Sequence, residues 1–254
     1  MFFAPIIRSS LFCLCIAPLI SCNQQFHPVR IEHSSIQIEH SERVSSDTAL
    51  KMLIQPYQDS LTHSVKQVIG FASHDLEKER PESTLGNWVA DAMLDYAEEV
   101  TGETFDFALT NYGGLRILSI PAGPITVEQM FELMPFDNLL VVTELSADDL
   151  TELLDHVAKN GGWPVSRGIQ FTISESRATN IRLKDKPIDT EKTYRVVIND
   201  YIANGGSDCH FLKEKPQRTL NVLIRDALIE IASRGAGNQI HAKLENRITL
   251  AERK

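Results

Sequence analysis

The spacing of apolar residues along the chain alternates between a helical period and short strand-like runs. Between residues 85 and 100, apolar side chains recur three and four positions apart, which places them on one face of a helix. Short apolar runs bounded by polar or glycine-containing segments predict buried strands instead. These patterns predict helices at residues 47–63, 85–100, 126–134, 146–159 and 220–233, and strands at residues 65–72, 105–109, 139–145, 169–174, 178–183, 194–199 and 247–250.

The mixed order of these elements predicts an α+β, or mixed α/β, fold in which helices flank a mixed sheet. Thr126 and Gln129 have the spacing of a capping box at a helix start. Gly102 follows a predicted helix directly and provides its stop. The pattern of a folded domain begins near Asp47, so residues 47–254 are predicted to form one domain, and the polar residues 23–46 before it a tether.

Residues 1–22 have the features of an export signal. Arg8 precedes an apolar run from Leu11 to Ile20, which is shorter than the roughly 20 apolar residues that span a bilayer. The run ends in Leu19-Ile20-Ser21-Cys22, which resembles a bacterial lipobox. We therefore expect an exported domain anchored by lipidated Cys22 to a bacterial membrane, on its periplasmic or cell-surface side. The alternative is a secretory signal that is cut nearby without lipidation.

Charge and cysteine content exclude some classes of function. A net charge of -9 and a pI near 5.4 argue against a nucleic-acid partner, which requires a basic surface. Three of the four cysteines lie in the signal segment, which leaves Cys209 as the sole thiol of the predicted domain. The domain therefore has no internal disulfide and no cysteine-rich metal site. We do not expect Cys209 and His210 to act as a nucleophile and base, because neighbours on a strand point to opposite faces.

The segment from Asn111 to Arg116 is the best candidate for a ligand-binding loop. Gly113 and Gly114 allow the backbone to approach a ligand closely. Arg116 offers a planar set of donors suited to phosphate or carboxylate, and the amide of Asn111 both donates and accepts hydrogen bonds. The same pattern also occurs in ordinary turns, so its meaning depends on other segments.

Four segments together resemble the 5'-nucleotidase C-terminal domain family. They are Glu82–Met93, Asn111–Arg116, Pro135–Asn138 and Tyr201–Gly206. Each motif is weak alone, but all four occur in the family's order with similar spacing, and the similarity runs over residues 65–250. The resemblance implies the fold of that domain, which binds the nucleotide substrate.

The resemblance also implies roles for individual residues. Phe136 and Tyr201 correspond to two aromatic residues that clamp the base, and stacking of one base on a ring contributes about 1–3 kcal/mol. Arg116 corresponds to an arginine that meets the phosphate, with Asn111 beside it, and Asn138 to a residue that bonds the base edge. The alternatives are ordinary core packing for the two aromatic residues and a surface ion pair for Arg116.

Other positions match the family less well. Gly205 and Gly206 match its glycine pair, but Ser207 occupies the position of the acidic residue that follows, with Asp208 one place later. The family arginine of the first motif is replaced by Pro81, with Arg80 one residue earlier. We expect Arg80 and Asp208 to contact the substrate from these shifted positions. The pair Gly161-Gly162 either approaches the ligand or ends a helix.

Complete family members also carry a metallophosphatase domain with two metal ions, which clamp the reacting oxygens. In this sequence no Asp-x-His opening, no Gly-Asn-His-Glu block and no His-x-His motif precedes or follows the matched region. We therefore expect no catalytic residue, metal site or cofactor in this chain. Divalent metals are expected only in a partner.

Two functions follow as hypotheses. In the first, the chain is the nucleotide-binding half of a split 5'-nucleotidase-type phosphohydrolase in nucleotide catabolism. It would present a 5'-nucleotide to a separately encoded metallophosphatase subunit. In the alternative, it is a non-catalytic surface lipoprotein that binds nucleotides or nucleosides.

Overall fold

The computed structural model describes residues 48–234 and 239–251, and leaves the side chains of residues 57–63 undescribed. Apart from Thr48, the described residues belong to one compact unit, Ala49–Lys254. The predicted signal segment, Cys22 and the predicted tether lie outside the described residues and stay predictions. Among the described residues, no helix combines the length and the apolar character needed to cross a membrane.

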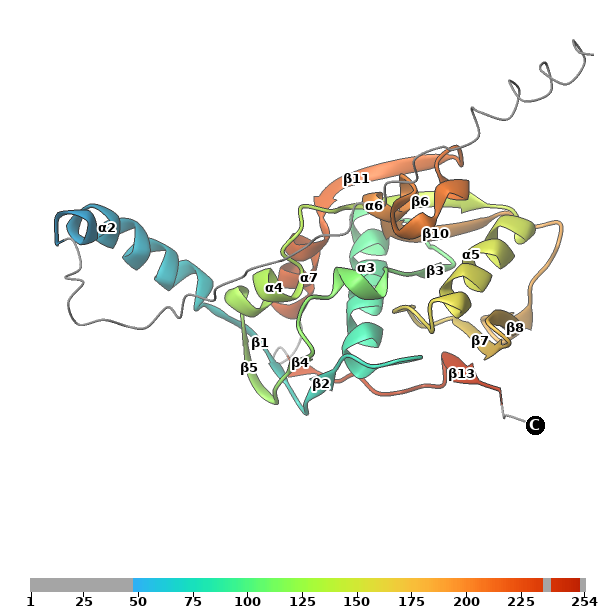
Figure 1. Ribbon diagram of the computed structural model, residues 1–254, viewed down its shortest axis with the longest axis horizontal. Coiled ribbons are helices and arrows are strands. Elements are labelled where there is room, and N and C mark those ends of the chain that lie inside the picture. Colours follow the sequence, from blue (N-terminus) through green and yellow to red (C-terminus); the bar gives the residue numbers. More distant parts are fainter. Residues whose placement is uncertain (1–47, 235–238, 252–254) are drawn as a thin grey trace, which may run out of the picture. The chain divides into compact units, whose positions relative to one another are not determined.

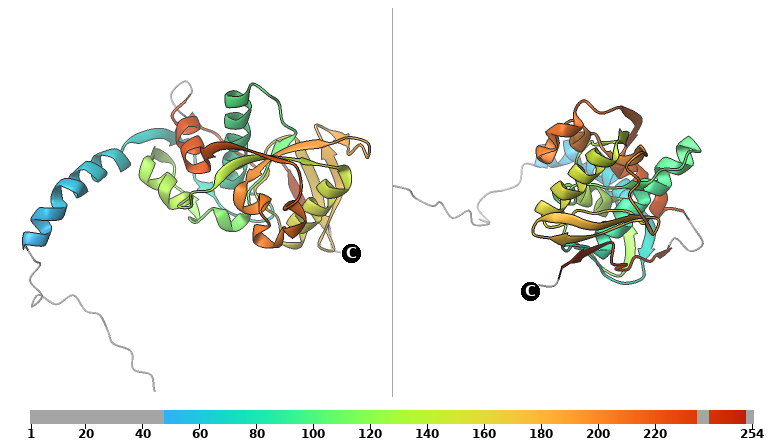
Figure 2. Two further views of the ribbon diagram at one scale, coloured as in Figure 1. Left: turned by 90° about the horizontal axis from the view of Figure 1, so that it is seen from above. Right: turned by 90° about the vertical axis from the view of Figure 1, so that its right-hand side faces the viewer.

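The described chain is a mixed α+β fold, which confirms the predicted fold class (Figures 1 and 2). The described helices are α2 (Thr48–Val65), α3 (Thr84–Thr101), α4 (Val127–Leu133), α5 (Ala147–Lys159), α6 (Asp200–Ala203) and α7 (Ile224–Ala232), with the short 3-10 helices η2 (Tyr112–Gly114), η3 (Gly206–Asp208) and η4 (His210–Leu212). The described strands are β1 (Val68–Ala72), β2 (Leu76–Glu77), β3 (Phe107–Ala108), β4 (Ser119–Ile120), β5 (Gly123–Thr126), β6 (Leu139–Leu145), β7 (Ile169–Ser174), β8 (Arg177–Leu183), β9 (Lys186–Pro187), β10 (Tyr194–Asn199), β11 (Gln217–Leu223), β12 (Gln239–Ile240) and β13 (Ile248–Leu250).

The strands form several sheets, and the central one has the order β11-β6-β10-β3. Strand β10 runs parallel to β3 and antiparallel to β6, with Asn199 opposite Leu140. The carboxyl ends of β3 and β10 and the beginning of β6 therefore lie at the same edge of this sheet. The loops that follow or precede those ends carry three of the four sequence motifs. The other sheets have the orders β12-β1-β5, β13-β7-β8-β9 and β2-β4.

Both faces of the central sheet are buried. Alternate residues of a strand point to opposite faces, and the pattern along β6 follows this rule. Leu140 and Val142 pack in one core cluster with residues of α3, α4 and α7, whereas Val141 packs in another with residues of α5, β7 and β13. Figures 1 and 2 show α5 grouped with β7 and β8 at one end of the unit. The sheet edge that carries the motif loops is thus held rigidly from both sides.

The helix ends confirm the signals in the sequence. Ser83 caps α3 by accepting a hydrogen bond from the Gly86 amide, and Gly102 ends this helix with a positive φ of 67°. Thr126 and Gln129 form a complete capping box at the start of α4. Gly86 lies against Pro164, where a Cβ atom would be 3.2 Å from the proline ring.

Two predicted elements differ from the structure. The predicted helix at residues 220–233 is wrong in its first part, because residues 217–223 form β11 and pair with β6. Asn221 has a φ of 56°, outside the helical region, and helix α7 begins only at Ile224. The helix predicted at residues 47–63 is present as α2, but Leu50 and Leu53 of its predicted apolar face are 56% and 67% exposed. Their apolar spacing therefore does not reflect burial among the described residues.

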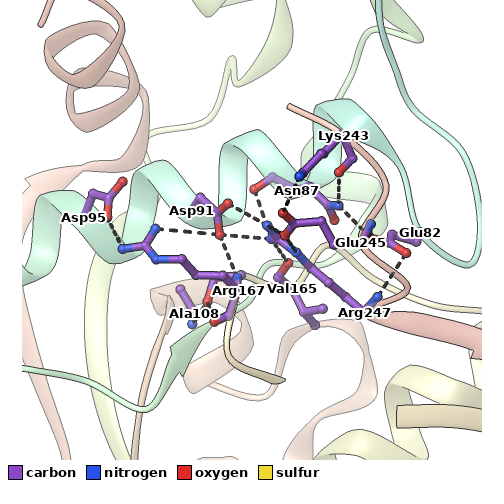
Figure 3. A network of polar contacts seen from close by, with 11 residues as sticks. Glu82, Asn87, Asp91, Asp95, Ala108, Val165, Arg167, Lys243, Glu245 and Arg247 are labelled. Carbon is purple, nitrogen blue, oxygen red and sulfur yellow. Dashed lines mark hydrogen bonds and ion pairs between the residues drawn. The ribbon is translucent and has the colours of Figure 1, made fainter. Parts of the chain in front are cut away.

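A buried arginine ties the last strand to α3 (Figure 3). The guanidinium of Arg247, 5% exposed, donates to both carboxylate oxygens of Asp91 at 2.9 and 2.7 Å. It also donates to Glu245 at 2.8 Å and to the Val165 carbonyl at 2.9 Å. Burial alone would lower the pKa of Arg247, but the hydrogen bonds and charges of Asp91 and Glu245 outweigh it and raise the pKa. The arginine therefore stays charged inside the fold.

The same network fixes the beginning of the first motif. The Glu82 carboxylate accepts hydrogen bonds from the backbone amides of Glu245 and Arg247 at 2.8 and 3.0 Å and from the Asn87 side chain at 2.7 Å. Figure 3 shows Glu82 and Asn87 facing the segment that leads into β13. The segment before α3, which includes Arg80 and Pro81, is thereby anchored next to the motif loops.

Candidate functional site: a cavity at one edge of the central sheet

A buried asparagine joins the first and last motif loops. Asn199, at the end of β10, donates from Nδ2 to Thr110 Oγ1 at 2.9 Å and to Asn111 Oδ1 at 3.1 Å. Its Oδ1 accepts the backbone amide of Ile202 at 2.7 Å and so caps α6, which carries Tyr201. Asn199 is fully buried. The loop after β3 and the helix after β10 are therefore held in one hydrogen-bonded unit.

The loop before β6 is attached to the same unit. The Asp200 carboxylate accepts the backbone amide of Leu139 at 3.1 Å. Arg225, at the start of α7, is 6% exposed and donates to Asp137 at 2.9 Å. It also donates to the carbonyl oxygens of Met134 and Phe136 at 3.3 and 3.4 Å. Sequence reasoning missed both Asn199 and Arg225, because each acts through contacts with residues far away in the chain.

The three loops enclose a cavity of about 420 Å³, a volume typical of small-molecule sites. The residues that line it are Asn111, Gly113, Gly114, Arg116, Phe136, Asn138, Tyr201 and Ser207. All except Ser207 are site residues predicted from the sequence. The structure therefore brings together residues from three separate motifs. Ser207 occupies the position of the family's acidic residue after the glycine pair. This position in the motif could have identified Ser207 as a site residue.

The two predicted aromatic residues are exposed at the cavity. Phe136 is 42% exposed and Tyr201 is 48% exposed, so neither is a core residue. The Tyr201 ring packs on Gly206, where an added Cβ atom would lie 2.5 Å from the ring. The Tyr201 hydroxyl accepts the backbone amide of Ser207 at 3.1 Å, which fixes the direction of the ring. Exposed, oriented rings suit the stacking of a planar ligand.

The glycines of the site have different roles. A Cβ atom added to Gly113 would have only the side-chain nitrogen of Asn111 nearby, at 3.6 Å. The loop is therefore open to a ligand at this position. Gly205 has a φ of 87°, and together with Gly206 it lines a hollow next to the cavity. Asn138 and Tyr201 line both the hollow and the cavity. Both glycines of the last motif therefore lie at the site, Gly206 beneath the Tyr201 ring.

Besides Gly205 and Gly206, which line the neighbouring hollow, two further predicted site residues lie outside the cavity lining. Asp208 is exposed and follows Ser207 in η3. The guanidinium of Arg80 is 4.0 Å from the ring centroid of Tyr112, next to the cavity. The Gly161-Gly162 pair ends α5 with positive φ angles, and Gly162 packs on the Pro81 backbone. These glycines thus support the Arg80 segment, and neither lines the cavity.

The position of Arg80 leads to a comparison with Arg116. We expect Arg116→Ala to weaken nucleotide binding about 10- to 100-fold, because Arg116 lines the cavity and a hydrogen bond to a charged group contributes about 1.5–3 kcal/mol. Arg80→Ala should cost less, since Arg80 contacts Tyr112 and is not among the residues that line the cavity. Calorimetric titration with AMP measures both losses, with Arg177→Ala on β8 as the charge-matched control. Equal losses for the Arg80 and Arg116 variants would show that Arg80 has the same role as Arg116.

Cys209 is buried, and its thiol is unreactive. Burial, together with the charge of Asp208, raises the pKa of its thiol to about 12. It lies between two 3-10 helices and not on a strand, so the reason given above for excluding a Cys209–His210 pair is wrong. The raised pKa excludes a reactive thiolate instead.

We expect Cys209 to resist a thiol reagent at about pH 8 in the folded protein and to react after unfolding in urea, because the thiolate is the reactive form. Peptide mass spectrometry distinguishes Cys209 from the other cysteines. Below its ordinary pKa of 9.0 the protonated thiol costs the folded state nothing. As the pH rises from 9.0 toward about 12, only the unfolded thiol ionises, so stability falls. Fast labelling of the native protein would contradict the buried position.

Two other kinds of site are alternatives to the cavity: a metal centre and a second hollow. No three His, Cys, Asp or Glu side chains among them come together as a metal site. A second hollow of about 350 Å³ lies at the start of β10, where Lys192 pairs with Asp106 and Arg195 with Glu103. Three of its charged side chains, Asp106, Lys192 and Arg195, are thus already paired. The cavity at the motif loops is the better candidate for a ligand site.

Comparison with known proteins gives the same assignment. The family model of the 5'-nucleotidase C-terminal domain matches residues 64–214. The chain is 27% identical over 230 residues to the trifunctional nucleotide phosphoesterase protein YfkN of Bacillus subtilis (strain 168), covering 83% of this chain and 15% of that protein. It is 27% identical over 187 residues to the 5'-nucleotidase of Vibrio vulnificus (strain CMCP6), covering 70% of this chain and 32% of that protein.

A solved structure extends the match to the fold. The crystal structure of a 5'-nucleotidase precursor from Thermus thermophilus matches with a TM-score of 0.68 at 32% sequence identity, covering 84% of this chain and 45% of that chain. The chain thus spans less than half the length of each of these three relatives. The residues matched by the family model include every residue that lines the cavity. The chain belongs to the 5'-nucleotidase C-terminal domain family.

Proposed function

We propose that this chain is the nucleotide-binding part of a 5'-nucleotidase-type phosphohydrolase in nucleotide catabolism. The observation that carries the proposal is the cavity, in which two exposed aromatic rings, an amide and an arginine converge from three loops. Phe136 and Tyr201 stack the base, and the Asn138 side chain bonds its edge. Arg116 and the open backbone at Gly113 receive the phosphate-bearing end.

The metal-dependent step belongs to a second polypeptide in this proposal. The chain presents the bound 5'-nucleotide to a separately encoded metallophosphatase subunit, which supplies the divalent metals. The described residues offer no fitting set of ligands, so no reaction step is assigned to this chain. Export and anchoring through lipidated Cys22 would place the complex on the periplasmic or cell-surface side of a bacterial membrane.

A second candidate function is a surface lipoprotein that binds nucleotides or nucleosides without turnover. The observation that favours it is that the groups lining the cavity suit binding: amides, a hydroxyl, an arginine and aromatic rings. Both candidates require the same pocket, and they differ in whether a catalytic partner docks next to it.

Two measurements test these proposals in sequence. The first is titration of the full chain with adenosine and AMP, and the absence of binding to either would reject both candidates. The second is phosphate release from AMP with a divalent metal, measured for this chain alone and after mixing with an exported metallophosphatase from the same source. A large gain on mixing is expected for the split enzyme, and binding without such a gain favours the lipoprotein. Turnover by the chain alone would overturn both.

A further inference from the structure

Two cations, Lys78 and Arg80, lie over the ring of Tyr112 in the loop beside the cavity, and a third, Arg116, lies over the ring of Phe136 on the cavity lining. Lys78 Nζ and the Arg80 guanidinium carbon each lie 4.0 Å from the ring centroid. The third cation, Arg116, is close enough for its charge, with that of Arg80, to lower the pKa of Lys78, although burial is the larger cause. Lys78 was not among the site residues predicted from the sequence.

Among the described residues, these cations lack the carboxylate partners that Lys192, Arg195 and Arg218 have. The ion pairs among the described residues include Arg195 and Arg218 with Glu103, and Lys192 with Asp106. Within this described part of the chain, no carboxylate forms an ion pair with Lys78, Arg80 or Arg116. Three uncompensated positive charges therefore lie together in a protein whose net charge is -9.

Lys78 is held in a defined position, and its ammonium group keeps N–H donors that are available to a ligand. Its backbone amide donates to Leu118 at 2.8 Å, and its ammonium donates to the Leu115 carbonyl at 2.7 Å. An ammonium group has three N–H donors, so two remain after the bond to Leu115. The loop that carries Asn111 and Arg116 thus holds the positively charged ammonium group of Lys78 in place.

We propose that Lys78 determines the preference of the site for ligands that carry more phosphate charge. This inference rests on the proposed nucleotide-binding function. Arg116, on the cavity lining, meets the first phosphate. Lys78 and Arg80, next to Tyr112, meet the negative charge that extends beyond it. The repulsion among the three cations is relieved when an anion binds between them, and the relief grows with the charge of the anion.

The test is calorimetric titration of the full chain with adenosine, AMP and ADP. These probes share a base and differ in phosphate charge. Lys78→Met keeps an unbranched side chain and removes the charge. We expect adenosine affinity to stay within about twofold, AMP affinity to fall by a few-fold and ADP affinity to fall about tenfold or more, because Lys78 meets the charge beyond the first phosphate and bonds to charged groups contribute most. Lys78→Arg should restore most of the loss.

Lys192→Met is the matched control. Lys192 is also a lysine over a tyrosine ring, 4.9 Å from the Tyr194 centroid, but it lies at the opposite end of β10 from the cavity. The Lys192→Met variant removes the same net charge as Lys78→Met and should leave the affinities for adenosine, AMP and ADP unchanged. The comparison therefore separates the local effect of Lys78 from a general change in charge.

Other outcomes overturn the inference in distinguishable ways. An equal loss for adenosine, AMP and ADP would show that Lys78 only holds the Leu115 loop. No loss for AMP or ADP would show that the lysine does not contact the anion. Wild-type protein that bound adenosine but bound AMP and ADP no more tightly would reject the cationic subsite while leaving the base pocket intact. Failure of the wild-type protein to bind any of the three would reject the proposed function, and this inference with it.

Discussion

Replacing Arg247 with alanine is expected to lower the free energy of unfolding by about 3–5 kcal/mol, because removing one partner of a buried ion pair leaves the other charge uncompensated. Asp91 would lose both of its bonds to the guanidinium, and Glu245 would lose its bond at 2.8 Å. The Val165 carbonyl would lose a donor as well. Urea unfolding followed by circular dichroism measures the change as a shift of the midpoint at constant slope.

Arg167→Ala is the matched control for this variant. Arg167 also pairs with Asp91 and Asp95, but its side chain is 47% exposed, against 5% for Arg247. Exposed pairs contribute about 0–1 kcal/mol, so this variant should unfold close to wild type. Similar losses for the two variants would mean that burial does not determine the strength of the network shown in Figure 3.

Truncation of the aromatic residues at the cavity is expected to have the largest effect on binding. Phe136→Ala and Tyr201→Ala should each weaken adenosine binding by about 1–3 kcal/mol, the contribution of one stacked base. Both side chains are nearly half exposed, so removing them should change the free energy of unfolding by no more than about 0.5 kcal/mol. Titration calorimetry and urea unfolding on the same samples separate the two effects.

Ring-preserving variants are the controls for this pair. Phe136→Tyr and Tyr201→Phe keep a stacking surface. The second removes only the hydroxyl that accepts the Ser207 amide at 3.1 Å. We expect both to bind adenosine nearly as well as wild type. If they lost as much affinity as the alanine variants, the rings would act through the shape of the loops and not through stacking.

Local signals in the sequence predicted much of the fold. The periodic face of α3, the capping box at Thr126 and the stop at Gly102 are short-range features, and all are present in the structure. β11 was taken for helix because its apolar residues fit either period. Pairing with β6 decides the outcome, and pairing depends on residues far away in the sequence. The short strands β2 and β4 were missed for the same reason.

The residues of the candidate site that belong to sequence motifs could be predicted. The residues that support the site through tertiary contacts could not. Seven cavity-lining residues stand in three recognisable motifs. The N-cap role of Asn199 is local, but its bonds to the first motif loop, and those of Arg225 to the loop before β6, join residues 88 and 88–91 positions apart and have no local signal. Lys78 is similar, since its bond to the Leu115 carbonyl joins residues 37 positions apart. Residues that support a site from a distance are visible only in the folded chain.

The bond between Asn199 and Asn111 also has a consequence for how the protein is made. The two residues are 88 positions apart, and ribosomes add about 5–20 residues per second, so the first loop waits on the order of ten seconds for its partner. During that interval the side chains of Thr110 and Asn111 cannot form their bonds to the Asn199 amide. The binding loop is therefore made early and organised late, when synthesis has passed the end of β10.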